Sequence, residues 1–205
     1  NDLGVDIYVF SAYKTFGTHV GVMWGKPDVL KRLVAQSHHF NRNKPRYRLN
    51  PTGPQHAQIA ALAGVGEYYD ALYNHHFDDA GLSRFQRAQK VFELIAEHET
   101  RLANQLFDTL NDLPSVRVIG LANATVATRA PTISLVCRGL KQSDLALRLA
   151  ERKVAVRSGD FYAARCIEAL GIEDREEGVL RVSIVHYNSE EEVSRLAHGL
   201  RILVS

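Results

Sequence analysis

The apolar positions at the start of the chain fall into two short runs that predict β-strands. Residues 5–10 are rich in β-branched and aromatic side chains, as a buried strand is, and residues 20–25 repeat the pattern. A short helix is expected over residues 28–36. The stretch 37–55, rich in His, Asn, Arg and Pro, is interpreted as a long loop of the kind that often carries function.

The next two apolar stretches have the spacing of helices. The first covers residues 55–72, and the second runs from Ser83 to about Leu113. Ser83 and Gln86 have the spacing of a capping box at the start of the second helix. Because such a helix exceeds the ordinary globular length, it is a natural bridge between two domains. We expect one domain over residues 1–95 and another over residues 96–205.

After Pro114 the pattern changes to short strands that alternate with helices. Ser189 and Glu192 predict a second capping box at the start of the last helix. This alternation is typical of a compact α/β unit with its own core. The expected strands are 116–119, 132–136, 154–157 and 180–185, and the expected helices are 143–151, 160–170 and 189–203.

Composition and charge narrow the function classes. A net charge of +2 is too small, and the basic residues too dispersed, to predict a nucleic-acid partner. No apolar run approaches the ~18 residues of a membrane span. Cys137 and Cys166 lie far apart and form no metal-spaced pair, which favours a reducing, cytoplasmic location. The chain starts at Asn1 without an initiator methionine and enters a strand at once, so we expect it to be the later part of a longer protein.

The turn between the first two strands holds a lysine in an unusual setting. Lys14 lies just beyond a predicted buried strand, among Phe10, Tyr13 and Phe16. An amine that condenses with a carbonyl must first lose its proton, and partial burial beside apolar groups favours the neutral form. Ser11 and Tyr13 add hydroxyl groups that suit a phosphate. The alternative on these local features is a solvated lysine in a strand–strand turn.

Three segments, in order, carry a resemblance to a known family. The first is DIYVFSAYKTFG at residues 6–17 with VGVMWG at 20–25, the second is AVRSG at 155–159, and the third is LRVSIVHYNSEEEV at 180–193. They resemble the cofactor-lysine signature, the segment before the substrate loop, and the closing strand and helix of class V aminotransferases and cysteine desulfurases. The matches span nearly the whole chain in the family's order.

The resemblance implies an α/β fold, namely the C-terminal portion of the pyridoxal 5′-phosphate (PLP) transferase fold type I. Residues 1–95 would then end the large PLP-binding domain, and residues 96–205 would form the small domain. Lys14 would bind PLP as a Schiff base and later move the substrate Cα proton. Ser11 and Tyr13 match phosphate-contacting positions, although Tyr13 stands where the desulfurases often have histidine. Thr52 lies near a family residue that reaches the phosphate from the partner subunit, which implies a homodimer.

Arg181 is predicted both by its strand and by the resemblance. In the last predicted strand it shares one face with Ser183, while Leu180 and Val182 share the other. An arginine in such a strand requires a carboxylate, which its planar fork binds through two hydrogen bonds. The resemblance assigns Arg181, helped by Arg157, to the carboxylate of an amino-acid substrate. The alternative is a structural salt bridge.

The chain departs from the family in two ways. Tyr162 stands where a desulfurase carries its nucleophilic cysteine, and we interpret Cys166 as a core thiol. The family residues that contact the cofactor ring come before the lysine strand and have no counterpart here. We therefore expect this chain to bind PLP weakly and to turn over little. A lyase, epimerase or transaminase reaction is as consistent with the residues as sulfur removal, and a non-catalytic structural or interaction domain is the alternative from another class.

Two other patterns are rejected. The glycines at 21 and 25 are spaced one residue too closely for a P-loop, and Pro27 stands where Ser or Thr is needed. The pairs His38-His39 and His75-His76 lack the spacing of a zinc helix, so no metal site is predicted.

Overall fold

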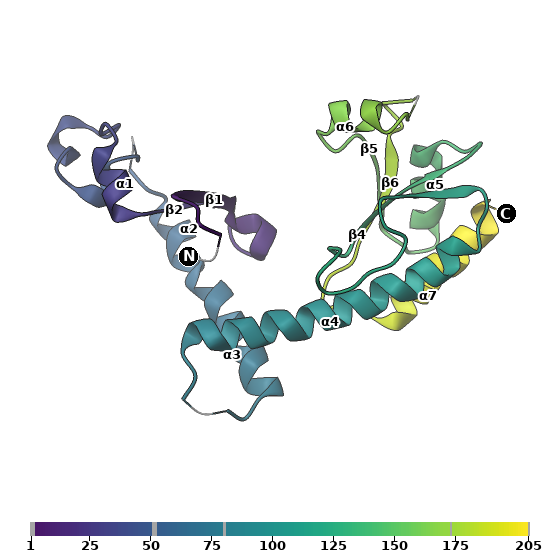
Figure 1. The fold of residues 1–205 in the computed structure, drawn as a ribbon, viewed down its shortest axis with the longest axis horizontal. Coiled ribbons are helices and arrows are strands. Elements are labelled where there is room, and N and C mark those ends of the chain that lie inside the picture. Colours follow the sequence, from purple (N-terminus) through teal and green to yellow (C-terminus); the bar gives the residue numbers. More distant parts are fainter. Residues whose placement is uncertain (1–2, 51–52, 80, 173, 205) are drawn as a thin grey trace. The chain divides into compact units, whose positions relative to one another are not determined.

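A computed structural model describes residues 3–50, 53–79, 81–172 and 174–204. The chain divides into two compact units, Asn1–Val91 and Phe92–Ser205, and the division falls inside the long helix α4 (Arg84–Asn111). Figure 1 shows the N-terminal unit in purple to blue and the C-terminal unit in teal to yellow. Nowhere in the described residues is a helix both long enough and apolar enough to cross a membrane.

The N-terminal unit begins with an antiparallel pair of strands. β1 (Ile7–Ser11) pairs with β2 (Gly21–Gly25), and Ser11 lies opposite Gly21 at the end of the pair. The 3₁₀ turn η1 (Ala12–Thr15) begins the connection between them. The prediction of a buried β1 is wrong for this chain, because four of its five residues are exposed. In the described residues β2 is the strand partner of β1, and a two-stranded sheet leaves most of its surface open.

Short helices and one long helix complete this unit. They are α1 (Pro27–Arg32), η2 (His39–Asn41), η3 (Pro45–Tyr47), α2 (His56–Ala61), α3 (Ala63–His76) and the start of α4. The single helix expected over 55–72 is therefore two helices. The predicted capping box of α4 is confirmed, because the Ser83 N–H donates to Gln86 Oε1 at 3.0 Å and the Gln86 N–H donates to Ser83 Oγ at 3.3 Å.

The C-terminal unit is built on an antiparallel four-stranded sheet. Its strands are β3 (Val116–Ile119), β4 (Thr132–Cys137), β5 (Arg157–Gly159) and β6 (Val179–Ser183), and their order across the sheet is β3-β4-β6-β5. β5 begins at Arg157 and not at Val154 as predicted. Lys153 has a left-handed φ of 61°, and the Val154 N–H turns back to donate to the Leu149 carbonyl, so the extended strand starts later.

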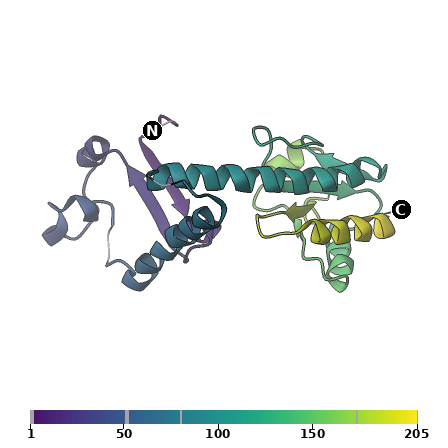
Figure 2. The same ribbon diagram turned by 90° about the horizontal axis from the view of Figure 1, so that it is seen from below.

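Helices cover one face of this sheet. α5 (Gln142–Glu151) and α7 (Glu190–Val204) pack there, and α7 runs beside the second half of α4 (Figures 1 and 2). The predicted cap of α7 is confirmed by the Glu192 N–H, which donates to Ser189 Oγ at 3.2 Å. The buried core of the unit lies between these helices and the sheet. It includes Leu102, Leu106, Phe107, Ile133, Leu135, Leu145, Leu149, Leu180, Val182, Leu196 and Leu200.

The segment after β5 is less helical than predicted. The expected helix 160–170 is reduced to α6 (Ala164–Ala169), because Phe161 and Tyr162 both have positive φ angles, 51° and 62°. Left-handed residues cannot continue a right-handed helix. This segment crosses to the sheet face away from α5 and α7, where Arg117 of β3 donates to the Leu170 carbonyl at 2.9 Å.

Candidate active site

The lysine turn is held by contacts close in the sequence. The Ala12 N–H donates to the Val20 carbonyl at 2.8 Å, and the Gly17 N–H donates to the Ala12 carbonyl at 2.9 Å. A Cβ atom on Gly17 would lie 2.9 Å from that same carbonyl oxygen, so the tight return needs glycine. Thr18 Oγ1 donates to the Gln58 carbonyl at 2.8 Å and ties the turn to α2. The backbone that presents Lys14 is therefore well supported.

The turn carries Tyr13 and Lys14 as exposed residues, and the half-buried Ser11 directly precedes it at the end of β1. The Tyr13 ring stacks on His19 with centroids 4.6 Å apart, and Lys14 Nζ lies 5.9 Å from the centroid of the Tyr13 ring. Lys14 is exposed, so the expectation of a partly buried amine is wrong for this chain. The reason is the open β1–β2 pair, whose exposed apolar residues leave the neighbouring turn uncovered.

The functional groups of the turn residues suit two groups of PLP, its aldehyde and its phosphate. No carboxylate of the described chain forms an ion pair with Lys14, so its amine is available for condensation. Ser11 is half-buried at the end of β1, and its hydroxyl makes no hydrogen bond with any described residue. A free amine and a free hydroxyl on one tight turn are groups that an aldehyde and a phosphate require.

The other predicted phosphate contact, Thr52, lies outside the described residues. Several residues near position 52 in the sequence line a cavity of about 680 Å³. Its lining includes Arg46, Arg48 and Gln58, together with His19. Its described lining does not include Ser11, Tyr13 or Lys14. This cavity and the lysine turn are therefore separate features, although His19 of the cavity lining stacks on Tyr13 of the turn.

The predicted substrate arginines lie together in the C-terminal unit. Arg157 of β5 pairs directly with Arg181 of β6, and Arg181 also pairs with Ser134 of β4. Directly opposed residues point to the same face of a sheet. The predicted alternation of β6 is confirmed, because Leu180 and Val182 are buried in the core while Arg181 lies on the other face.

This arginine pair has no counter-charge in the part of the chain that the structure describes. Neither Arg157 nor Arg181 forms an ion pair with a carboxylate among the residues described, so the salt-bridge alternative has no partner there. Like charges directly opposite each other on adjacent strands are destabilising. Two such guanidinium groups attract an anion, and a carboxylate matches their donor geometry.

The segment that follows Arg157 contacts the second arginine. The Arg181 Cζ atom lies 3.7 Å from the centroid of the Phe161 ring, which is half-buried. Tyr162 is fully exposed, at 105% of its reference area. Cys166 is exposed too, so its interpretation as a core thiol is wrong, and Ile167 is the buried residue of α6. A six-residue helix offers too little periodicity to decide which side is buried.

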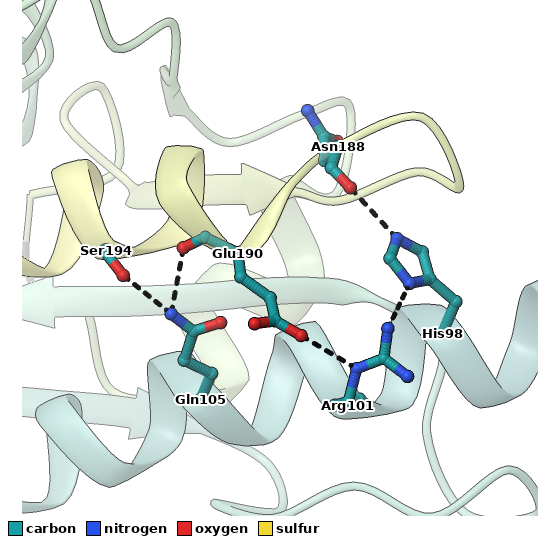
Figure 3. A network of polar contacts seen from close by, with 6 residues as sticks. All are labelled: His98, Arg101, Gln105, Asn188, Glu190 and Ser194. Carbon is teal, nitrogen blue, oxygen red and sulfur yellow. Dashed lines mark hydrogen bonds and ion pairs between the residues drawn. The ribbon is translucent and has the colours of Figure 1, made fainter.

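A polar network fastens the start of α7 and the loop before it to α4 (Figure 3). Arg101 donates to His98 Nδ1 at 2.8 Å, so His98 Nε2 carries the hydrogen that it donates to the Asn188 carbonyl at 2.9 Å. Arg101 Nε also donates to Glu190 Oε1 at 3.1 Å. Gln105 donates to the Glu190 carbonyl and to Ser194 Oγ. The connection that follows the Arg181 strand is therefore anchored at its far end.

Comparison with known proteins identifies the family. Residues 1–196 match the model of the aminotransferase class V family. The chain belongs to this family. The family consists of PLP-dependent aminotransferases and cysteine desulfurases, which confirms the resemblance carried by the three segments.

Individual relatives are similar over almost the whole chain. An aminotransferase-like protein of Gibberella zeae, FGM3, is 30% identical over 207 residues that cover 99% of this chain and 47% of that protein. A probable cysteine desulfurase of Pseudomonas putida is 30% identical over 219 residues, which cover 98% of this chain and 47% of its own length. The chain therefore spans about half the length of the curated relatives it matches.

A solved structure confirms the fold. The cysteine desulfurase CsdA of Escherichia coli matches with a TM-score of 0.74 at 22% identity, over 98% of this chain and 46% of that one. The prediction of an α/β fold that is part of PLP fold type I is thus confirmed.

Two features of the site were missed from the sequence. The first is the register that opposes Arg157 to Arg181, and the second is the stack of Phe161 on Arg181. No grouping of three or more His, Cys, Asp or Glu side chains that could hold a metal occurs in the described residues.

Proposed function

We propose that this chain is part of a PLP-dependent enzyme that acts at the Cα atom of an amino acid, with Lys14 as the residue that binds the cofactor. The observation that carries the proposal is the Lys14 amine, which forms no ion pair with a described carboxylate and is presented on a tight turn just after Ser11, in a member of a PLP-dependent family. Bound PLP supplies stabilisation of negative charge at Cα.

The residues of this chain would each do a defined part of the chemistry. Lys14 holds the cofactor and then carries the proton to or from Cα. Ser11 and Tyr13 donate hydrogen bonds to the phosphate, and Thr52 does so towards the partner subunit of a homodimer. Arg181 binds the substrate carboxylate through its planar fork, and Arg157 adds a second positive charge from the neighbouring strand. Orientation by such groups is a major part of the catalytic effect in sites of this type.

We propose that the reaction is not a persulfide-forming desulfuration at position 162. A phenol cannot accept sulfur from cysteine as a persulfide, and Tyr162 stands where the desulfurases have their nucleophile. Lyase, epimerase and transaminase reactions can each begin with removal of the Cα proton, for which Lys14 is the proposed base, and they need no nucleophile at position 162. The free thiols of Cys137 and Cys166 support a reducing, cytoplasmic environment.

A second candidate is a non-catalytic structural or interaction domain that retains the fold. The exposure of Lys14 favours it, since partial burial beside apolar groups is what assists condensation of an amine with a carbonyl. For the same reason we propose that these 205 residues alone bind PLP weakly, and that full activity needs the remaining length found in the relatives.

Covalent trapping separates the two candidates. The protein is incubated with PLP, reduced with borohydride and digested, and the modified peptide is identified by mass spectrometry. The enzyme hypothesis expects PLP on Lys14, loss of the label in Lys14→Ala, and retention in Lys31→Ala, which removes another exposed lysine of the same unit. Labelling spread evenly over surface lysines would contradict it and support the structural candidate.

The reaction is then identified with a protein of the relatives' full length. Amino acids are screened while sulfide, keto acid and racemised product are each assayed. Release of sulfide that is lost in Tyr162→Phe would contradict the proposal on desulfuration. Release that persists in Tyr162→Phe and is lost in Cys166→Ser would agree with it and place the sulfur chemistry at the exposed thiol.

A further inference from the structure

The guanidinium group of Arg181 is covered on one side by an aromatic ring. Its Cζ atom lies over the ring of Phe161, 3.7 Å from the ring centroid and well within the ~6 Å range of a cation–π contact. Phe161 belongs to the loop after β5, and this loop begins at Asp160, three residues beyond Arg157. Phe161 therefore follows Arg157 closely in the sequence, while its ring contacts Arg181 of the neighbouring strand.

A stack of this kind leaves the hydrogen-bond donors of arginine free. The N–H groups of a guanidinium point outward in its plane, so a ring on its face blocks none of them. No described residue accepts a hydrogen bond from Arg181. The stack thus restricts the plane of the group and removes water from one face, while the edge that would bind a carboxylate stays open.

The stack also opposes a repulsion. Arg157 lies directly across from Arg181, and like charges at such positions push the two side chains apart. Without a contact on Arg181, its long side chain would turn away from Arg157 and the two donors would diverge. The ring of Phe161 supplies the contact that holds one of them in place.

The backbone is strained where it delivers this ring. Phe161 and Tyr162 are consecutive left-handed residues, with φ of 51° and 62°, a backbone conformation that crowds the Cβ atom and is unfavourable for residues other than glycine. The loop is tied by the Tyr162 N–H, which donates to Asp160 Oδ1 at 3.0 Å. Tyr162 gains no packing from the strain because it is fully exposed. The contact that the strained turn secures is the one between Phe161 and Arg181.

We propose that Phe161 is a positioning residue, which orients the guanidinium of Arg181 to bind the carboxylate of an amino acid. The identity of the ligand rests on the proposed function. The orienting effect on a simple carboxylate does not, because it needs neither PLP nor turnover.

The test uses carboxylate binding by the 205-residue chain. The protein is labelled with ¹⁵N, and the side-chain Nε–H resonance of Arg181, assigned with Arg181→Lys, is followed during titration with acetate. Phe161→Leu removes the aromatic face and keeps an apolar side chain, whereas Phe161→Trp keeps the stack. Tyr162→Ala is the matched control, since it changes the adjacent exposed ring. Circular dichroism of each variant verifies that the fold is retained.

The proposal expects saturable binding in the wild-type chain, an apparent Kd about three to ten times weaker in Phe161→Leu, and near-normal values in Phe161→Trp and Tyr162→Ala. Equal binding in Phe161→Leu would overturn the proposal, as would tighter binding, which would make the ring an obstacle. Absence of saturable binding in the wild-type chain would overturn it too.

A kinetic arm on the enzyme of full length separates this inference from the proposed function. There Phe161→Leu is expected to raise KM for the amino acid by a similar factor, with a smaller change in kcat. If PLP never attaches to Lys14 but Phe161→Leu still weakens acetate binding, the proposed function fails and the positioning role stands. If PLP attaches to Lys14 but Phe161→Leu changes neither the acetate affinity nor KM, only the positioning role fails.

Discussion

Arg157 and Arg181 lie directly opposite each other on adjacent antiparallel strands, so that two positively charged side chains share one face of the sheet. Such a pair costs stability, and no described carboxylate offsets it by an ion pair. Residues that bind ligands commonly lower stability in this way. The opposition of the two arginines therefore indicates a binding role more directly than either arginine does alone.

Neutralising one arginine is expected to stabilise the fold while weakening binding. In Arg157→Gln the free energy of unfolding should stay the same or rise by about 0.2–1 kcal/mol, because a like-charge pair is removed. Acetate affinity should fall by about threefold or more, as one charge-assisted bond is lost. Denaturant unfolding and the titration measure the two effects. Arg165→Gln, which removes an exposed arginine from α6, should change neither.

The two thiols are expected to differ sharply in reactivity. Burial raises the pKa of Cys137 to about 11, whereas Cys166 is exposed. Because the thiolate is the nucleophile, Cys137 should react with a thiol reagent only when the protein unfolds. A count with Ellman's reagent should give one fast thiol in the native protein and two in denaturant, and Cys166→Ser should abolish the fast one. Fast labelling of Cys137 in that variant would contradict the packing of β4.

Stability should depend on pH through His186. Burial lowers its pKa below the ordinary value of 6.5, and the nearby His98 lowers it further. The unfolded chain therefore takes up this proton first as the pH falls, so the contribution of His186 is present above 6.5 and is lost as the pH falls through the folded pKa. Unfolding free energies measured from about pH 8 to about pH 5 should decline less in His186→Asn than in the wild type.

Glu99 is expected to act in the opposite direction. Burial raises its pKa above the ordinary value of 4.5, against smaller lowering effects of the His186 backbone and of His98. A carboxyl group of this kind favours the folded state when protonated, and that contribution is lost as the pH rises through the folded pKa. Glu99→Gln should therefore show a steeper acid decline than the wild type in the same measurement. A shallower one would show that Glu99 is better solvated than its position on α4 indicates.

The sequence predicted those elements whose signals are local. The caps at Ser83 and Ser189 place the starts of α4 and α7 to within one residue, because a capping box is a set of hydrogen bonds between residues three apart. The alternation of β6 was equally clear, because its period needs only a few residues. The lysine turn was recognised through its family signature, and the role of Lys14 stays a prediction.

The features that the sequence did not predict depend on contacts between residues distant in the sequence or on uncommon backbone conformations. The register of β5 against β6 is a non-local choice, and the late start of β5 followed from the left-handed Lys153. The stack of Phe161 needs two left-handed residues where the sequence favours a helix. Burial of β1 and Lys14 would require other elements to pack over them, and the residue pattern of a strand does not show whether such elements are present.

The end of the β5–β6 pair should be highly sensitive to a single methyl group. Gly178 has a φ of +54°, and a Cβ atom there would lie 2.2 Å from the Gly159 carbonyl oxygen, a backbone atom that cannot move without shifting β5. Gly178→Ala is expected to destabilise the fold by about 2–5 kcal/mol, from a left-handed alanine and from overpacking. Gly139→Ala is the matched control, because Gly139 has a φ of +75° and open space around it.

The control should lose only about 1–2 kcal/mol, the cost of the left-handed backbone alone. The difference between the two variants in denaturant unfolding thus isolates the steric clash. Because Gly159 is in the same strand as Arg157, acetate binding should weaken in Gly178→Ala and remain normal in Gly139→Ala. Equal losses of stability in the two variants would contradict the close approach of Gly159 and Gly178, and with it the register that opposes Arg157 to Arg181.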